Sequence, residues 1–204
     1  MRSRFRTVDS VPQAVRNTME TKKMVNGVDL EALHETIDAV RDDRSLGKVS
    51  FAVSGEWQGG FRVNSQTGGL TQAGQVDNSR LGKFTMSSDE PATLLGTDTA
   101  VSPAEYVLQA LAGCYTVTLA ANAASRGIEL ESYTLELEAD FDLASFLGVA
   151  PDEAPGAREI RVKVHLIAPG ATREELQDLV EIVQKRSPIR DTLIRPVDVV
   201  TKLV

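Results

Sequence analysis

The feature that most constrains the fold of this chain is a long apolar helix predicted between Ser102 and Arg126. Ser102 is a favoured N-cap residue, Pro103 suits the first helical position, and Glu105 completes a Ser-x-x-Glu capping box. Gly127 supplies the signal that ends the helix. Between these ends, apolar residues occupy nearly every side of the helix. We therefore expect it to be buried all round, at the centre of the fold.

Segments with the two-residue period of a β-strand lie on both sides of this helix. Before it, alternating residues and Gly-Gly turns predict an antiparallel meander, with strands around residues 49–53, 61–63 and 83–86. After it, alternation predicts strands at residues 133–141, 160–166 and 197–203. A Pro- and Gly-containing insertion at residues 143–157 is expected to form a short helix and a surface loop.

Two further helices are predicted from apolar residues at helical spacing. An amphipathic helix at residues 29–40 should lie against the main body, and a second helix at residues 172–187 should end at Pro188. The order of elements indicates an α+β fold, with antiparallel sheets packed on the long buried central helix and the second helix. We divide the chain into residues 1–47, a tail followed by the amphipathic helix, and one domain at residues 48–204. The tail, up to about residue 25, is expected to be mobile or dependent on a partner.

Composition excludes several classes of function. The chain has 204 residues and a net charge of −7, so we expect no binding to nucleic acid or to acidic membranes. Its apolar stretches are judged too short to cross a bilayer, and its first residues lack the apolar core of a secretory signal. One cysteine permits no internal disulfide, which agrees with a cytoplasmic location. With two histidines and that cysteine, neither a metal site nor another cofactor is expected.

The run Ser102-Pro-Ala-Glu-Tyr-Val-Leu-Gln-Ala-Leu-Ala-Gly-Cys114 resembles the central-helix signature of the OsmC/Ohr superfamily. Two flanking segments look like the same family's flanks, at Leu94–Asp98 and Ala124–Ile128. Ser187–Leu193 looks like its second-helix signature, and Asn26–Asp29 resembles the N-terminal extension of one OsmC-like subgroup. Together the matches cover residues 26–204 in the expected order.

This resemblance implies both a fold and an activity. It implies an OsmC-like fold assembled as an intertwined homodimer, with the helix thiol near the subunit interface. The characterised members reduce organic hydroperoxides. In them a peroxidatic cysteine attacks the peroxide, a second cysteine resolves the sulfenic acid as a disulfide, and an arginine–glutamate pair stabilises the thiolate. Cys114 matches the peroxidatic position, eleven residues after Pro103, although a free cysteine is also commonly a small buried hydrophobe.

The chemistry at Cys114 requires a thiolate, so a cation is needed nearby. The start of the helix is several turns away, where the influence of the helix dipole has faded. Arg62, on an early strand after a Gly-Gly turn, is the predicted cation because it lies roughly where the hydroperoxidases carry theirs. Arg80 and Arg186 remain alternatives, and each of the three arginines taken alone also fits an ordinary surface position.

Glu105 is the predicted acidic residue of the site, but its spacing favours a structural role. Nine residues separate it from Cys114, which places the two on opposite helix faces and about 13 Å apart along the axis. Glu105 could then act only through an arginine or across a dimer. The best-known hydroperoxidases place glutamate directly after the proline, where this chain has Ala104.

Ser187 departs from the family at the position of the resolving cysteine. The hydroperoxidases have Cys-Pro there, so in this chain a sulfenic acid at Cys114 would need an external thiol. We therefore hypothesise a one-cysteine thiol peroxidase that reduces organic hydroperoxides, lipid-like ones above all, with an external thiol reductant. The alternative is a noncatalytic homodimeric binding protein for a small apolar molecule, in which Cys114 only packs. A thiol or electrophile sensor is a third reading.

Overall fold

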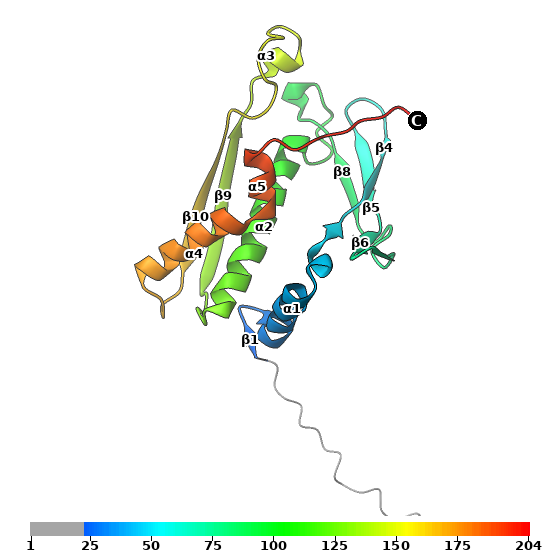
Figure 1. Ribbon diagram of the computed structural model, residues 1–204. Coiled ribbons are helices and arrows are strands. Elements are labelled where there is room, and N and C mark those ends of the chain that lie inside the picture. The colour runs from blue at the N-terminus through cyan, green and yellow to red at the C-terminus, as the bar shows by residue number, and fades with distance from the viewer. Residues whose placement is uncertain (1–22) are drawn as a thin grey trace, which may run out of the picture.

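The computed structural model describes residues 23–204, so most of the tail predicted up to about residue 25 lies outside the described residues. The tail prediction is wrong for its last residues, because Met24 and Val25 form a short strand. Helix α2 (Pro103–Ser125) runs through the middle of the molecule (Figure 1). The Ser102 hydroxyl accepts from the Glu105 N–H, and the Glu105 carboxylate accepts from the Ser102 N–H at 2.9 Å. This pair confirms the predicted capping box. Gly127, at a φ of 68°, follows the last turn and takes the left-handed conformation expected of a helix stop.

Only one side of α2 is buried within the chain. That side carries Leu111, Tyr115 and Leu119, which form a core cluster with Val183 of helix α4 (Arg173–Arg186). The opposite side is open, and Val117 is 70% exposed there. Within one chain the helix is therefore buried on one side, and not on all sides as predicted.

By length and composition alone, α2 is apolar enough to cross a membrane, and among the described residues it is the one such helix. This corrects the expectation that every apolar stretch is too short. One such helix is weak evidence for a membrane span, because the core helix of a folded domain passes the same test. The contacts of α2 with α4 and with strand β9 (Ser132–Asp140) are those of a core helix.

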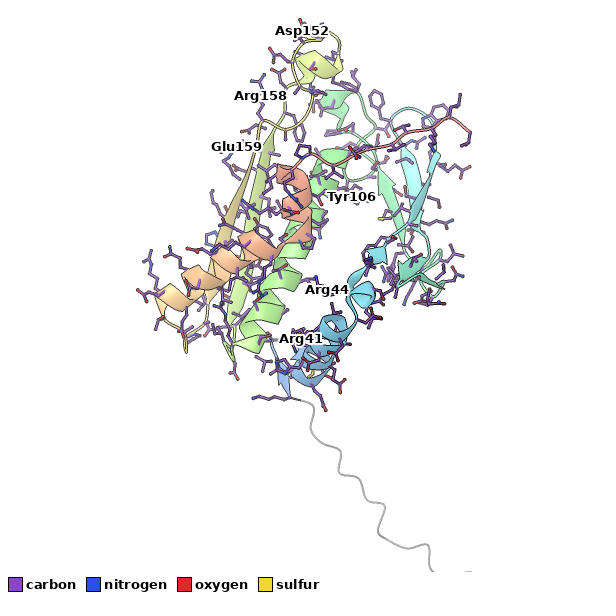
Figure 2. All side chains as sticks on the ribbon, in the orientation of Figure 1. Arg41, Arg44, Tyr106, Asp152, Arg158 and Glu159 are labelled. Carbon is purple, nitrogen blue, oxygen red and sulfur yellow. The ribbon has the colours of Figure 1, made fainter. Side chains whose placement is uncertain are left out.

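A long antiparallel hairpin covers the buried side of α2. Strand β9 pairs with β10 (Glu159–Ile167) over nine residue pairs, from Ser132 opposite Ile167 to Asp140 opposite Glu159. Alternate residues pack against the core, and the others form a charged outer face on which Arg161 pairs with three carboxylates. Both strands were predicted from this alternation. The insertion between them contains α3 (Leu143–Phe146) and a loop held by Arg158, whose guanidinium pairs with two carboxylates (Figure 2).

The meander forms two three-stranded antiparallel sheets. One has the order β4-β5-β8, from strands Val53–Trp57, Val63–Thr67 and Thr85–Ser88. The other has the order β3-β6-β7, from strands Val49–Ser50, Leu70–Gln72 and Gln75–Asp77. The β4-β5-β8 sheet and the β9–β10 hairpin lie on opposite sides of α2 (Figure 1). The Tyr106 hydroxyl donates to the Ser87 carbonyl oxygen at 2.8 Å, which ties the start of α2 to β8 (Figure 2).

The N-terminal extension docks on the far end of α2. It consists of β1 (Met24–Val25), β2 (Val28–Asp29), the predicted amphipathic helix α1 (Leu30–Asp42) and a short 3-10 helix, η1 (Arg44–Gly47). Val25 and Leu30 pack against Ala124 near the end of α2. The Asn26 amide donates to the Ile128 carbonyl oxygen at 2.8 Å and accepts from the Leu130 N–H at 2.9 Å. Two hydrogen bonds therefore join the turn between β1 and β2 to the segment that follows α2.

The C-terminal region differs from the prediction in two places. Pro188 ends α4, as expected, but it is also the first residue of another helix, α5 (Pro188–Ile194). The prediction of a strand at residues 197–203 is wrong for the single chain. These residues form no β-ladder and lie exposed, and the exposed fraction of Val199 is 87%. The alternating residues are present, but no strand of the described chain pairs with them. A second short 3-10 helix, η2 (Ala92–Leu94), precedes α2.

Candidate functional site

The Cys114 sulfur lies where α2 meets the junction between α4 and α5. Two groups from that junction donate to it: the Ser187 hydroxyl at 3.1 Å and the Ile189 N–H at 3.5 Å. Cys114 is half-buried, whereas Ser187 is only 1% exposed. The sulfur therefore has a hydrogen-bond donor from a buried serine, in a cysteine that is itself partly exposed.

The local sequence explains how the junction reaches the sulfur. Helix α4 is anchored to the core by Leu179 and Val183, which are almost fully buried. Pro188 cannot continue α4, because proline lacks the N–H that a helix interior needs. Ser187 instead adopts an extended conformation and caps α5, its hydroxyl accepting from the Arg190 N–H at 3.3 Å. The turn between the two helices is thereby fixed with its serine facing α2.

Arg190 brings a positive charge to this corner of the fold. Burial raises the pKa of Tyr115 above its ordinary value, the Arg190 guanidinium partly offsets that rise, and the Cys114 sulfur adds to it. The Tyr115 hydroxyl therefore lies within electrostatic reach of both the arginine and the thiol. The guanidinium also donates to the Gln184 carbonyl oxygen at 3.1 Å, at the last turns of α4.

A surface hollow lies near the thiol, and no cluster of metal ligands is found in the described chain. A surface hollow at this corner is lined by Gln177, Val180, Glu181, Gln184, Lys185 and Arg190, and Cys114 is not part of its lining. Within residues 23–204, no three His, Cys, Asp or Glu side chains come together as metal ligands would. The chemistry of the site therefore rests on the sulfur and its donors.

The OsmC-like protein family model matches residues 96–202, just over half of the chain, and this stretch contains both Cys114 and Ser187. The chain belongs to the OsmC-like family. Its fold agrees with that assignment. An OsmC-like protein from Mycoplasma pneumoniae superposes with a TM-score of 0.56 at 17% identity, over 71% of this chain and 87% of that one.

A second solved structure gives the same result. An organic hydroperoxide resistance protein, OsmC, from Legionella pneumophila superposes with a TM-score of 0.50 at 16% identity, over 71% of this chain and 88% of that one. At such identities the likeness shows the fold and not the activity. No curated protein matches this sequence significantly.

The arginines proposed from the sequence of this OsmC-like chain lie in three different places. Arg62 is in the β4–β5 turn, where its guanidinium donates to the Gln58 carbonyl oxygen at 3.0 Å. Arg80 lies over the Phe84 ring, 5.2 Å from its centroid. Arg186, at the end of α4, donates to Asn122 of α2 at 3.1 Å. Within one chain Arg62 is thus held by its own hairpin, and its role at the thiol stays a prediction.

Glu105 serves the start of α2 in this structure. Its carboxylate accepts the Ser102 N–H, as the capping-box reading expected, and it lies nine residues before Cys114 on the same helix. The single chain does not bring Glu105 and Cys114 together. A role for Glu105 across a dimer stays a prediction.

Sequence reasoning missed two groups at the site, the Ile189 N–H and Arg190. The signal was nevertheless present. Ser187-Pro188 repeats the Ser-Pro pair that starts α2 at Ser102-Pro103, and the same pair begins a second helix here. If Ser187-Pro188 is interpreted as a helix start, the sequence predicts a capped turn at Ser187, with backbone N–H groups just after Ser187 that have no acceptor within the helix.

Proposed function

We propose that this chain is a one-cysteine thiol peroxidase that reduces organic hydroperoxides with an external thiol as reductant. One observation carries the proposal: the half-buried Cys114 sulfur accepts hydrogen bonds from Ser187 and Ile189, within the matched part of the family. Hydrogen bonds to the charged form of a group favour that form. The thiolate is the nucleophile that a peroxide requires.

The proposed reaction balances without a second protein cysteine. The thiolate sulfur attacks one peroxide oxygen, so that an S–O bond forms, the O–O bond breaks and the alkoxide leaves as an alcohol after taking a proton. The sulfur is oxidised by two electrons to a sulfenic acid. An external thiol then displaces water to give a mixed disulfide, and a second thiol releases Cys114 and an external disulfide. A reducing cytoplasm, the proposed location, supplies such thiols.

We propose that the active form is a homodimer. Support comes from the apolar surface that one chain leaves open: Val117 on α2, Phe51 at 78% and Trp57 at 73% exposed in the meander, and the C-terminal segment with Val199. Large apolar side chains exposed on several elements of one chain are expected where a second copy covers them. A second copy is also the proposed route by which Arg62 reaches Cys114, since Arg62 is held by its own hairpin within one chain.

The experiment that tests the activity is direct oxidation of the thiol. Reduced protein is exposed briefly to stoichiometric cumene hydroperoxide with a sulfenic-acid trap and analysed by intact-protein mass spectrometry, with Cys114→Ser as the control. We expect rapid trapping at Cys114, faster than with hydrogen peroxide, and steady consumption of the hydroperoxide when dithiothreitol is present. Absence of any adduct in folded protein would refute the peroxidase and favour the noncatalytic binding protein.

A further inference from the structure

The Ser187 side chain makes two hydrogen bonds of opposite sense. Its oxygen accepts from the Arg190 N–H at 3.3 Å, and its hydroxyl donates to the Cys114 sulfur at 3.1 Å. A serine hydroxyl carries a single proton. The Arg190 N–H uses one of the two lone pairs of the oxygen, and the hydroxyl proton is directed at the sulfur. A thiolate can only accept, so this arrangement suits the charged form of Cys114.

The backbone supplies a second donor beside the serine. Ile189 is near the start of α5, where N–H groups have no acceptor within the helix. Its N–H is directed at the sulfur at 3.5 Å, and it cannot rotate away because the helix fixes it. The two donors come from adjacent positions of one turn and converge on one atom.

Burial makes the serine contact stronger than the same contact at a surface. Ser187 is 1% exposed, so no water competes for its hydroxyl. Hydrogen bonds to a charged acceptor are stronger than neutral ones, and a low local dielectric strengthens them further. The thiolate therefore gains a donor from a buried residue, while Cys114 as a whole stays partly exposed.

We propose that Ser187 is a catalytic residue that holds the Cys114 sulfur as the thiolate. The proposal rests on the peroxidase function above and assigns a role to the residue found where the hydroperoxidases have their resolving cysteine. A serine there forms no bond with the oxidised sulfur. It acts as a donor while the sulfur passes from thiolate to sulfenic acid and then to the mixed disulfide with the external thiol.

The test compares two serine variants with a cap variant remote from the sulfur. Ser187→Ala removes the donor and the α5 cap, whereas Ser187→Gly removes the donor and leaves a residue that is accepted at an N-cap. Thr172→Ala removes the equivalent cap of α4, which accepts the Glu175 N–H, without touching the sulfur. The readout is the rate of Cys114 alkylation by iodoacetamide from pH 5 to 10, with circular dichroism to verify folding.

We expect both Ser187 variants to shift the midpoint of the alkylation profile upward by about one pH unit, which makes the rate near neutral pH about tenfold lower. Thr172→Ala should leave the profile unchanged. Profiles in folded Ser187→Gly and Ser187→Ala that coincide with the wild-type one would overturn the proposal.

A parallel measurement separates this proposal from the peroxidase function. The rate constant with cumene hydroperoxide is measured for the same proteins. If the wild-type thiol does not react with hydroperoxide but its alkylation still depends on Ser187, the peroxidase fails and the thiolate contact stands. If the wild type and both Ser187 variants react with hydroperoxide at one rate, the peroxidase stands and the role of Ser187 fails.

Discussion

At the scale of single residues, the site depends on a contact between positions 73 apart in the sequence. The residues at both ends, Cys114 and Ser187, could be picked out from sequence motifs alone. Their contact could not be predicted, because it is made by the packing of α4 and α5 on α2. Apolar periodicity shows which face of a helix is buried, but not which other element packs against that face. The arginine at this corner was missed for the same reason: Arg190 follows the serine in sequence, but only packing places it near Tyr115.

Replacing Ser187 by cysteine should restore an internal disulfide. The Ser187 oxygen is 3.1 Å from the Cys114 sulfur, and a disulfide needs the two sulfurs at about 2.05 Å, a small further approach. We expect Ser187→Cys to lose two hydrogens in mass after mild oxidation, with a linked peptide in a non-reducing digest. Ser125→Cys, at the exposed end of α2, is the matched control and should keep both thiols free. Two free thiols in oxidised Ser187→Cys would contradict the geometry.

Asp89 should make stability depend on acid pH. This fully buried carboxylate accepts from the hydroxyls of Thr97 and Thr99 and from backbone N–H groups, which holds its pKa well below the usual range. Because the folded pKa is the lower one, the stabilisation is fully present above the ordinary value of 3.8 and is lost as pH falls below it.

Asp89→Asn is therefore expected to destabilise the protein clearly at pH 7 and somewhat less at pH 3, because the lowered pKa of the folded carboxylate keeps much of the stabilisation at that pH. Urea unfolding at the two pH values measures this difference. Asp152→Asn, at an exposed carboxylate in the insertion, is the control and should change little at either pH. An Asp89→Asn effect that is equally large at pH 3 would show that packing, not charge, is responsible.

At the scale of elements, explicit start and stop signals were the part of the fold that sequence predicted well. The predicted capping box at Ser102 is present with both reciprocal hydrogen bonds, and the Thr172-x-x-Glu175 pattern at the start of α4 forms a second one. Helix α5 was missed because Pro188 was interpreted as a stop only. The short strands β6 and β7 were missed because three residues are too few to show a period of two. The turn that holds Asn26 was matched by resemblance, but its two long-range hydrogen bonds carry no sequence signal.

Asn26 should determine how firmly the N-terminal extension is docked. It makes two hydrogen bonds to the segment after α2, and its φ of 53° is in the left-handed region that asparagine and glycine tolerate. Asn26→Gly keeps that conformation and should cost about 2 kcal/mol for the two lost bonds. Asn26→Ala should cost about 1 kcal/mol more, because alanine also resists the left-handed conformation.

Urea unfolding followed by circular dichroism gives these two free energies. Limited proteolysis should show faster cleavage between residues 23 and 48 in both variants. Equal stability of wild type and Asn26→Gly would mean that the apolar contacts of Val25 and Leu30 with Ala124 hold the extension without the asparagine.

At the scale of the whole molecule, apolar surfaces that the sequence marked as buried lie open in the single chain. The far side of α2, the meander and the segment at residues 197–203 share this property. A hydrophobic pattern reports that a face will be covered, but it does not say which chain covers it. This ambiguity explains why α2 was predicted as buried all round, and why a predicted C-terminal strand has no partner in one chain. A second copy of the chain that covers these apolar surfaces would explain both differences.

Val117→Glu should separate that homodimer into monomers. Val117 is 70% exposed in one chain, on the side of α2 opposite the core, so the substitution does not disturb the fold of the chain itself. In a dimer it would bury an unpaired carboxylate in an apolar interface, which costs about 3–5 kcal/mol and weakens association about a hundredfold or more. Thr134→Glu, on the charged outer face of β9, adds the same charge where solvent remains and should change nothing.

Size-exclusion chromatography with light scattering should give about twice the chain mass for the wild type and Thr134→Glu, and the chain mass for Val117→Glu. A wild-type protein that runs as a monomer at micromolar concentration would contradict the dimer, and with it the route by which Arg62 is proposed to reach Cys114.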